Sequence, residues 1–226
     1  MLGAASLGLL GLAGPPAMAG SHSWRINEVF SNADGTIQFI ELKECCGLPN
    51  EIGIGNKWVS SQATGNSFVF PSNLPPNSTA NKHLLLATAG FAALPGAPTP
   101  DYIIPAGFFA IKVDTLDYWF YDTFTFGPGE LPTDCITSLH DGGGGPNFTG
   151  PNSPTNFNDE TGSINACPCP ADIDNSNDVG VKDLLFLLGA WGTCPAKGDC
   201  PADFDDSGDV GVKDLLFLLG AWGPCP

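Results

Sequence analysis

Short apolar runs typical of β-strands fill the first two thirds of the chain. Six of them carry β-branched and aromatic residues between Gly- or Pro-containing turns, at 24–30, 36–42, 67–70, 83–88, 108–113 and 118–126. Asn-Ala-Asp-Gly at 32–35 suits a hairpin turn between the first two runs. No sustained helical period with caps occurs in this part. We therefore expect a mainly β fold, organised as an antiparallel sandwich.

From residue 169 onward the apolar pattern changes, because the chain repeats itself. Residues 169–195 align without gaps on 200–226, with 23 of 27 positions identical. Each copy contains VKDLLFLLGAW, in which Val181, Leu184, Leu185 and Leu188 share one helical face. We expect one face of each helix to pack on the sister helix. The remaining apolar surface either completes the core of this small unit or meets another partner.

Composition divides the chain into four segments. Residues 1–19 join a short apolar run to Ala-Met-Ala, which predicts a signal peptide cleaved after Ala19. We expect the β-sandwich in 20–140, Gly/Pro/Asn-rich loops and a linker in 141–166, and the repeat pair in 167–226. No other run is long enough for a transmembrane segment, so the predicted localisation is secreted, extracellular or at the cell surface.

Charge and cysteine usage narrow the function classes. A net charge of −16 excludes electrostatic binding of nucleic acid, which needs clustered Lys and Arg. Eight cysteines favour an oxidising compartment. The repeat predicts a disulfide within each copy, Cys169 with Cys194 and Cys200 with Cys225. The remaining cysteines leave bridges from the adjacent pair at 45 and 46 to those at 135 and 167, in an order that the sequence does not set.

Each copy also contains a twelve-residue loop with oxygen-bearing residues at the spacing of an EF-hand. Positions 1, 3, 5, 7 and 12 are Asp172, Asp174, Ser176, Asp178 and Asp183 in the first copy, and Asp203, Asp205, Ser207, Asp209 and Asp214 in the second. Position 7 contributes its backbone carbonyl. Position 6 needs a left-handed turn, which Gly208 and Asn177 both tolerate, and Val210 at position 8 is expected to let the two loops pair. Because Ca²⁺ accepts several oxygens in flexible geometry, we predict two calcium sites.

The doubled D-x-D-x-S-G-D-V-G-V-K-D-L-L pattern resembles the type I dockerin family, and the likeness covers residues 169–226. The resemblance implies a small α-helical tandem EF-hand module that docks to a cohesin-like or other extracellular protein. It also implies that docking uses loop positions 10 and 11 and the helix that follows. These positions are Val181, Lys182, Val212 and Lys213. Their identity in both copies implies two equivalent docking faces related by a pseudo-twofold axis.

The β part carries a second resemblance. Ile26-Asn27-Glu28-Val29, a hairpin and then Gln38-Phe39-Ile40-Glu41-Leu42 resemble the opening of a lamin tail domain, and segments 68–71 and 84–87 extend the likeness. It implies an immunoglobulin-like β-sandwich that serves as a non-catalytic binding or structural module.

Catalytic chemistry has little support in the sequence. Glu28 and Glu41 could face each other across the first hairpin, as glycosidase carboxylates do, but a structural role at strand positions is favoured. His22, His83 and His140 lack metal-ligand spacing, and Ser138 with His140 is interpreted as a surface loop pair. The leading hypothesis is a non-enzymatic secreted protein docked through its calcium-binding repeats. The alternatives are a structural matrix or envelope protein without a dedicated partner, and a carbohydrate-active enzyme, acting on polysaccharide, carried by its dockerin-like module.

Overall fold

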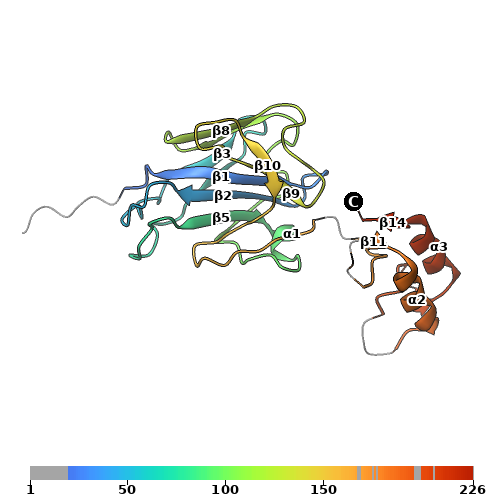
Figure 1. The fold of residues 1–226 in the computed structure, drawn as a ribbon. Coiled ribbons are helices and arrows are strands. Elements are labelled where there is room, and N and C mark those ends of the chain that lie inside the picture. The colour runs from blue at the N-terminus through green and yellow to red at the C-terminus, as the bar shows by residue number, and fades with distance from the viewer. Residues whose placement is uncertain are drawn as a thin grey trace, which may run out of the picture.

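The structure is a computed structural model that describes residues 20–166, 169–174, 176, 178–195, 200–205 and 207–225. The fold is mainly β: sheets make up residues 20–166, and two helices lie in the repeat (Figure 1). The predicted signal peptide, Asn177 and Cys167 lie outside the described residues. Within the described part of the chain, no helix is long and apolar enough to cross a membrane.

The larger sheet has six strands in the order β10-β9-β1-β2-β5-β6. Its strands are β1 (Trp24–Ser31), β2 (Gln38–Glu44), β5 (His83–Thr88), β6 (Tyr102–Ile104), β9 (Thr137–His140) and β10 (Phe148–Pro151). All neighbours are antiparallel except β5 and β6, which the single-turn helix α1 (Ala89–Ala92) helps to connect in parallel. The antiparallel prediction therefore holds for this sheet apart from one edge.

The second sheet has four antiparallel strands in the order β4-β3-β7-β8. They are β3 (Trp58–Ser61), β4 (Ser67–Val69), β7 (Asp114–Tyr118) and β8 (Asp122–Phe126). One hydrophobic cluster contains residues of both sheets, among them Trp24, Val59, Leu86 and Phe126. The two sheets therefore pack over a shared core.

The central strands of the larger sheet are covered on both faces. A second cluster lies on the side away from the smaller sheet, where Phe30, Phe39 and Leu85 pack against Phe91 of α1 and against Ile164. This second layer explains why β5 reads as a continuous apolar run instead of an alternating one.

Two of the predicted strands are wrong in detail. Residues 118–126 form a hairpin, since β7 ends at Tyr118 and β8 begins at Asp122. Segment 108–113 is irregular, although Phe108 and Phe109 are buried. Both errors have one cause: aromatic residues look like strand residues whether they stand in a strand, in a tight turn or in a buried loop.

The prediction that residues 141–166 are a linker is also wrong. The segment contains β10, which pairs with β9, and it then returns across the larger sheet. The Asn152 side chain donates to the backbone carbonyls of Ile136 and Ile164, and Ile164 and Ala166 are buried. These residues therefore belong to the β part. The polar Gly/Pro/Asn composition reflects side chains that bond to neighbouring backbone, which a compositional argument cannot distinguish from solvation.

The two repeat copies pair crosswise. The first contributes β11 (Asp178–Val179), α2 (Val181–Gly189) and β12 (Gly192–Thr193), and the second β13 (Asp209–Val210), α3 (Val212–Gly220) and β14 (Gly223–Pro224). Strand β11 pairs with β14, and β12 pairs with β13. The sequence predicted that Val210 would let the two loops pair with each other. Val210 instead faces Gly192 of β12, the strand that follows the sister helix. Val179, Leu187, Val210 and Leu218 form the core.

The disulfides follow the same crosswise arrangement, so the predicted pairing within each copy is wrong. Cys169 is bonded to Cys225, and Cys194 to Cys200. The start of each copy lies beside the end of the other, because each loop strand pairs with the strand that follows the sister helix. In the β part, Cys45 is bonded to its neighbour Cys46, which corrects the predicted bridges to distant cysteines. Cys135 is also disulfide-bonded.

Candidate functional site

Each repeat loop gathers three carboxylates into one cluster. In the first copy Asp172, Asp174 and Asp183 place one oxygen each within 4.8 Å of one another, and Asp203, Asp205 and Asp214 do the same in the second. These six are loop positions 1, 3 and 12 of the two copies, as the sequence predicted for metal ligands. An all-oxygen cluster of this kind is chemically suited to a hard divalent cation.

The carboxylate at position 12 also holds the loop in shape. Asp183 is 1 % exposed; its Oδ1 accepts the backbone N–H groups of Ile173 and Asp174, and its Oδ2 accepts that of Gly180 at 2.8 Å. It therefore joins the beginning of the loop to the first turn of α2 (Val181–Gly189). A carboxylate near a helix N-terminus is favoured electrostatically as well.

The second copy repeats this arrangement. Asp214 accepts the N–H groups of Phe204, Asp205 and Gly211 at 2.8, 3.3 and 2.8 Å. Gly208 has a φ of 88°, which confirms the left-handed turn predicted at position 6.

The serines at position 5 organise the remaining predicted ligands. The N–H of Ser176 donates to Asp172 Oδ1 at 2.9 Å and to Asp174 Oδ1 at 3.2 Å, while its hydroxyl donates to the carbonyl of Asp178. Ser207 makes the equivalent bonds to Asp203, Asp205 and the carbonyl of Asp209. The carboxylates of Asp178 and Asp209 stay outside the three-carboxylate clusters and are exposed. In both copies the carbonyl of position 7 accepts a hydrogen bond from the serine at position 5, and in the first copy the Ser176 hydroxyl also lies 3.1 Å from the carboxylate of Asp178.

Lysines lie beside both clusters. Lys182 Nζ is 3.4 Å from Asp174 Oδ2, and Lys213 Nζ is 3.2 Å from Asp205 Oδ2. Hydrogen bonding from Ser176 lowers the pKa of Asp174, and the charge of Lys182 acts in the same direction. Ser207 and Lys213 lower the pKa of Asp205 in the same way. Both carboxylates are therefore held in the ionised form that binds cations.

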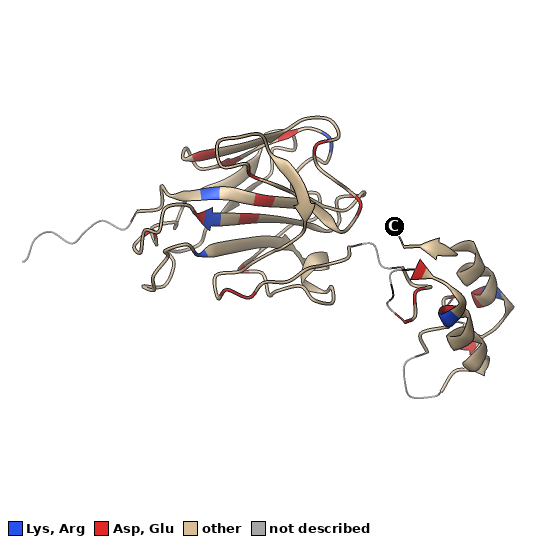
Figure 2. Cartoon of the chain, in the orientation of Figure 1, with Lys and Arg blue, Asp and Glu red and all other residues tan. Residues whose placement is uncertain are grey.

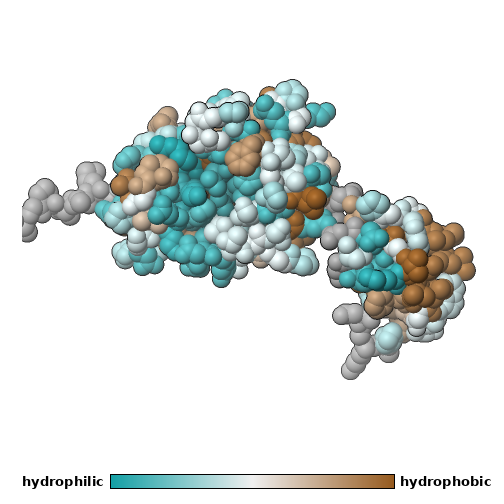
Figure 3. All heavy atoms as spheres, in the orientation of Figure 1, coloured by the Kyte–Doolittle hydropathy of each residue, from teal (hydrophilic) through white to brown (hydrophobic). Residues whose placement is uncertain are grey.

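A broad apolar surface lies next to the loops (Figure 3). The exposed side chains are Val181, Leu185, Phe186, Leu188 and Trp191 in the first copy, and Val212, Leu216, Phe217, Leu219 and Trp222 in the second. We call these two sets the apolar faces. Lys182 and Lys213, predicted to contact a partner, are 78 % and 83 % exposed in their side chains.

One face of each helix packs into the module core, but it is not the face shared by the apolar stripe. Of the stripe Val181, Leu184, Leu185 and Leu188, only Leu184 packs against the module core, and Leu187 is the fully buried leucine. The buried Asp183 fixes the rotation of α2, because the side that carries this carboxylate must face the loop. Leu187 lies one turn farther on the same side.

In the β part, Glu28 and Glu41 face each other across β1 and β2, as the sequence suggested (Figure 2). Both are buried, and every carboxylate oxygen has a partner. Glu28 accepts from the hydroxyls of Ser138 and Ser153 and from the Ser153 N–H. Glu41 accepts from the Asn27 amide and the Thr155 N–H, and His83 Nδ1 is 2.8 Å from its Oε1.

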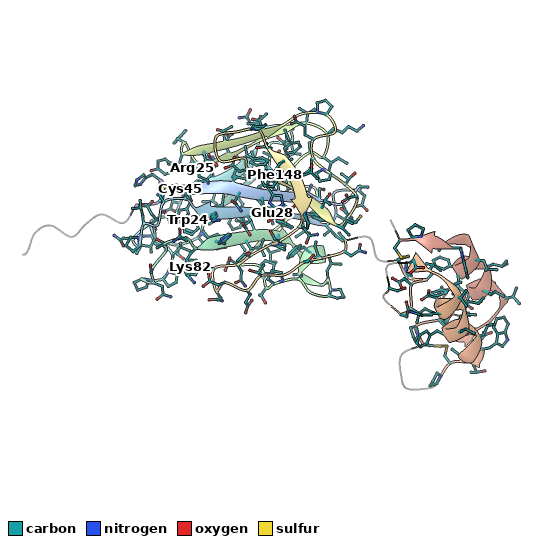
Figure 4. All side chains as sticks on the ribbon, in the orientation of Figure 1. Trp24, Arg25, Glu28, Cys45, Lys82 and Phe148 are labelled. Atoms are coloured by element: carbon teal, nitrogen blue, oxygen red, sulfur yellow. A yellow bond between two sulfur atoms is a disulfide. The ribbon has the colours of Figure 1, made fainter. Side chains whose placement is uncertain are left out.

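The interpretation of Ser138 and His140 as a surface loop pair is wrong. Ser138 is fully buried in β9, with its Oγ 3.0 Å from His140 Nε2 and 2.6 Å from Glu28 Oε1. Figure 4 shows Glu28 and Phe148 at the same end of the larger sheet, where Phe148 stacks on His140. Burial raises the pKa of Glu28; the neighbouring Glu41 adds to this, and the hydrogen bonds from Ser138 and Ser153 oppose it. A serine bonded to a buried carboxylate presents no nucleophile to solvent.

Comparison with known proteins found no matching family model, no matching curated protein and no matching solved structure.

Proposed function

We propose that the protein is a secreted, non-catalytic two-part protein that its C-terminal repeat module docks to another extracellular or cell-surface protein when calcium is bound. In this proposal, residues 169–226 are a dockerin-like tandem EF-hand and residues 20–166 are an immunoglobulin-like sandwich of the lamin tail type. The observation that carries it is the pair of apolar faces, each adjacent to a three-carboxylate cluster.

The donor set supports calcium as the ion. In each copy, the carboxylates at positions 1, 3 and 12 converge, and the position-7 carbonyl is hydrogen-bonded to the serine at position 5 of the same loop. Asp172, Asp174 and Asp183 would hold one ion and Asp203, Asp205 and Asp214 the other. The ion supplies positive charge that offsets the repulsion of three carboxylates lying close together. Lys182 and Lys213 offset part of that repulsion from outside the loops.

The apolar faces support docking. Leu185 and Leu216 are each 63 % exposed on helices that already share a core through Leu187 and Leu218. Exposed apolar side chains in such number are typical of an interaction surface. The two apolar faces come from repeat copies with the same helix sequence, so either face presents the same side chains to a partner. Val181 and Lys182 in the first copy correspond to Val212 and Lys213 in the second.

A non-catalytic β part is supported by the bonding of Glu28 and Glu41. Their oxygens accept hydrogen bonds from buried donors, so neither carboxylate is available to a glycosidic bond. Glycosidases need two carboxylates that reach the substrate.

The test uses the full-length protein as bait against secreted and envelope fractions of the source organism, with calcium and then with chelator. Leu185→Asp and Leu216→Asp each disable one face, and the double variant disables both. We expect one defined protein to be retained with calcium by the wild type and by each single variant, and lost from the double variant and with chelator. Retention by the double variant, or retention unaffected by chelator, would contradict the proposal.

A further inference from the structure

The hairpin between β7 (Asp114–Tyr118) and β8 (Asp122–Phe126) has a tryptophan at a turn position where glycine, asparagine or aspartate is usual. The N–H of Tyr121 donates to the carbonyl of Tyr118 at 3.0 Å, so residues 118–121 form a tight turn. Trp119, the second residue of this turn, has a φ of 50°. Positive φ at that position belongs to the turns that connect hairpins, where Gly, Asn or Asp is favoured. A bulky residue there strains the backbone.

The strained turn holds one exposed ring, Phe120, against two half-buried ones, Trp58 and Trp119. Trp119 contacts Trp58 of β3, with ring centroids 3.7 Å apart, and Phe120 lies 5.3 Å from Trp58 and 4.9 Å from Trp119. Phe120 is 79 % exposed, the most exposed large apolar side chain among the described residues. We call Trp58, Trp119 and Phe120 the aromatic platform. A strained backbone that keeps Phe120 in solvent, beside the accessible parts of two tryptophans, indicates a functional role for these rings.

The surface that continues from the platform is polar and nearly uncharged. In the four strands of the smaller sheet, all within the described residues, Asp117 is the only charged member of the outward-facing positions: Trp58, Ser60, Ser67, Val69, Thr115, Asp117, Thr123 and Thr125. Asp117 accepts hydrogen bonds from the Gln62 amide and the Thr123 hydroxyl at 2.8 and 3.1 Å. Rings thus border a row of hydroxyl, amide and carboxylate groups.

We propose that this surface binds an uncharged polysaccharide. One face of a sugar ring carries C–H groups, which are attracted to the negative face of an aromatic ring, while its hydroxyls require hydrogen-bond partners around the edge. The platform supplies the aromatic face, and Gln62, Asp117 and Thr123 supply the hydrogen-bonding groups. An anionic polymer is disfavoured, because the outward positions of these four strands carry no Lys or Arg and the chain has a net charge of −16.

The extent of the platform disfavours a protein partner. Three rings present at most a few hundred Å² of apolar surface, since a whole aromatic side chain buries about 150–250 Å². A stable protein interface needs roughly 800 Å² on each side. The inference is independent of the docking proposal, because no residue of the repeat takes part.

The test measures depletion of the full-length protein from solution by insoluble cellulose, chitin and neutral xylan, with alginate beads as the anionic comparison. Trp119→Gly removes a ring and relieves the positive φ, so we expect its melting temperature to stay within about 3 °C of the wild type. Phe120→Ala removes the most exposed ring without touching the backbone. Phe148→Ala is the matched control, because Phe148 is an exposed aromatic (55 %) on the other sheet.

We expect the wild type and Phe148→Ala to bind at least one neutral polysaccharide, with or without chelator and at high salt. Trp119→Gly and Phe120→Ala should bind at least tenfold more weakly. Failure of the wild type to bind any neutral polymer, or full binding by both platform variants, would overturn the inference. So would concentration-dependent dimers that Trp119→Gly abolishes, since the platform would then belong to a second copy.

Discussion

At the scale of single residues, Glu28 and Glu41 anchor the returning chain to the central hairpin. Their partners Ser138, Ser153 and Thr155 are 110, 125 and 114 residues away in sequence. Hydrogen bonds to a charged acceptor are stronger than neutral ones, and they fix the position of segment 152–156 without apolar packing. This explains how a Gly- and Asn-rich stretch becomes part of a folded sheet.

We predict that Glu28→Gln changes how stability depends on pH. Burial raises the pKa of Glu28 above its usual 4.5, so the folded state binds this proton more tightly than the unfolded state does. Its contribution to stability is therefore greatest below about pH 4.5 and decreases as the pH rises through the raised pKa. The melting temperature of the wild type should fall, relative to that of Glu28→Gln, as the pH rises above 4.5.

The control for this prediction is Glu130→Gln, which makes the same chemical change at an exposed position and so corrects for the loss of one negative charge. Melting curves for Glu28→Gln and the wild type that shift in parallel with pH would show that Glu28 keeps an ordinary pKa.

Whether the sequence could predict one of these contacts depends on how many residues separate its two partners. That Glu28 faces Glu41 follows from a short hairpin, where the turn sets the register. The donors Ser138 and Ser153 could not be found, because no local pattern links a serine to a carboxylate more than 100 residues away. Position-12 aspartates were found for the opposite reason: the repeat displays their spacing twice.

At the scale of elements, the repeat shows what a helical pattern can and cannot determine. The start of each helix was predicted well, since α2 and α3 (Val181–Gly189 and Val212–Gly220) begin where the VKDLLFLL segments begin, with the position-12 aspartates in their first turns. The buried face of the helix was not predicted, because VKDLLFLL is apolar around most of its circumference and no single stripe is distinct. The rotation of each helix is fixed by a buried aspartate, Asp183 or Asp214. An analysis of hydrophobic periodicity does not take such a charged residue into account.

A pair of leucines tests this assignment of faces. Leu187→Ala should destabilise the repeat module by about 2–5 kcal/mol, because it leaves a cavity at a fully buried position. Leu185→Ala, two residues earlier and 63 % exposed, should change stability by no more than about 0.5 kcal/mol. Unfolding is followed by circular dichroism at the helical minimum, which reports mainly on α2 and α3. Equal losses in the two variants would mean that the apolar stripe faces inward.

At the scale of the whole molecule, the described residues form separate cores. Two hydrophobic clusters contain only residues up to 166, and the third only residues from 169 onward. The two crosswise disulfides stabilise the part of the chain that contains the third cluster. Cys169–Cys225, 56 residues apart, contributes about 4 kcal/mol on the chain-entropy estimate, against about 2 kcal/mol for Cys194–Cys200, 6 residues apart. A module with so small a core depends on such crosslinks.

The long crosslink also determines how the module responds to proteolytic nicking. With Cys169 bonded to Cys225, any single cut between them leaves the two products covalently joined. In a Lys182→Gln/Lys213→Gln variant, trypsin cuts residues 167–226 only after Lys197, between the copies; the products of this cut should stay joined on a denaturing gel without reductant and separate with it. Disulfides within each copy would release two fragments before reduction. A single broken peptide bond therefore leaves the two parts of the module covalently joined, and the gel distinguishes the two disulfide pairings directly.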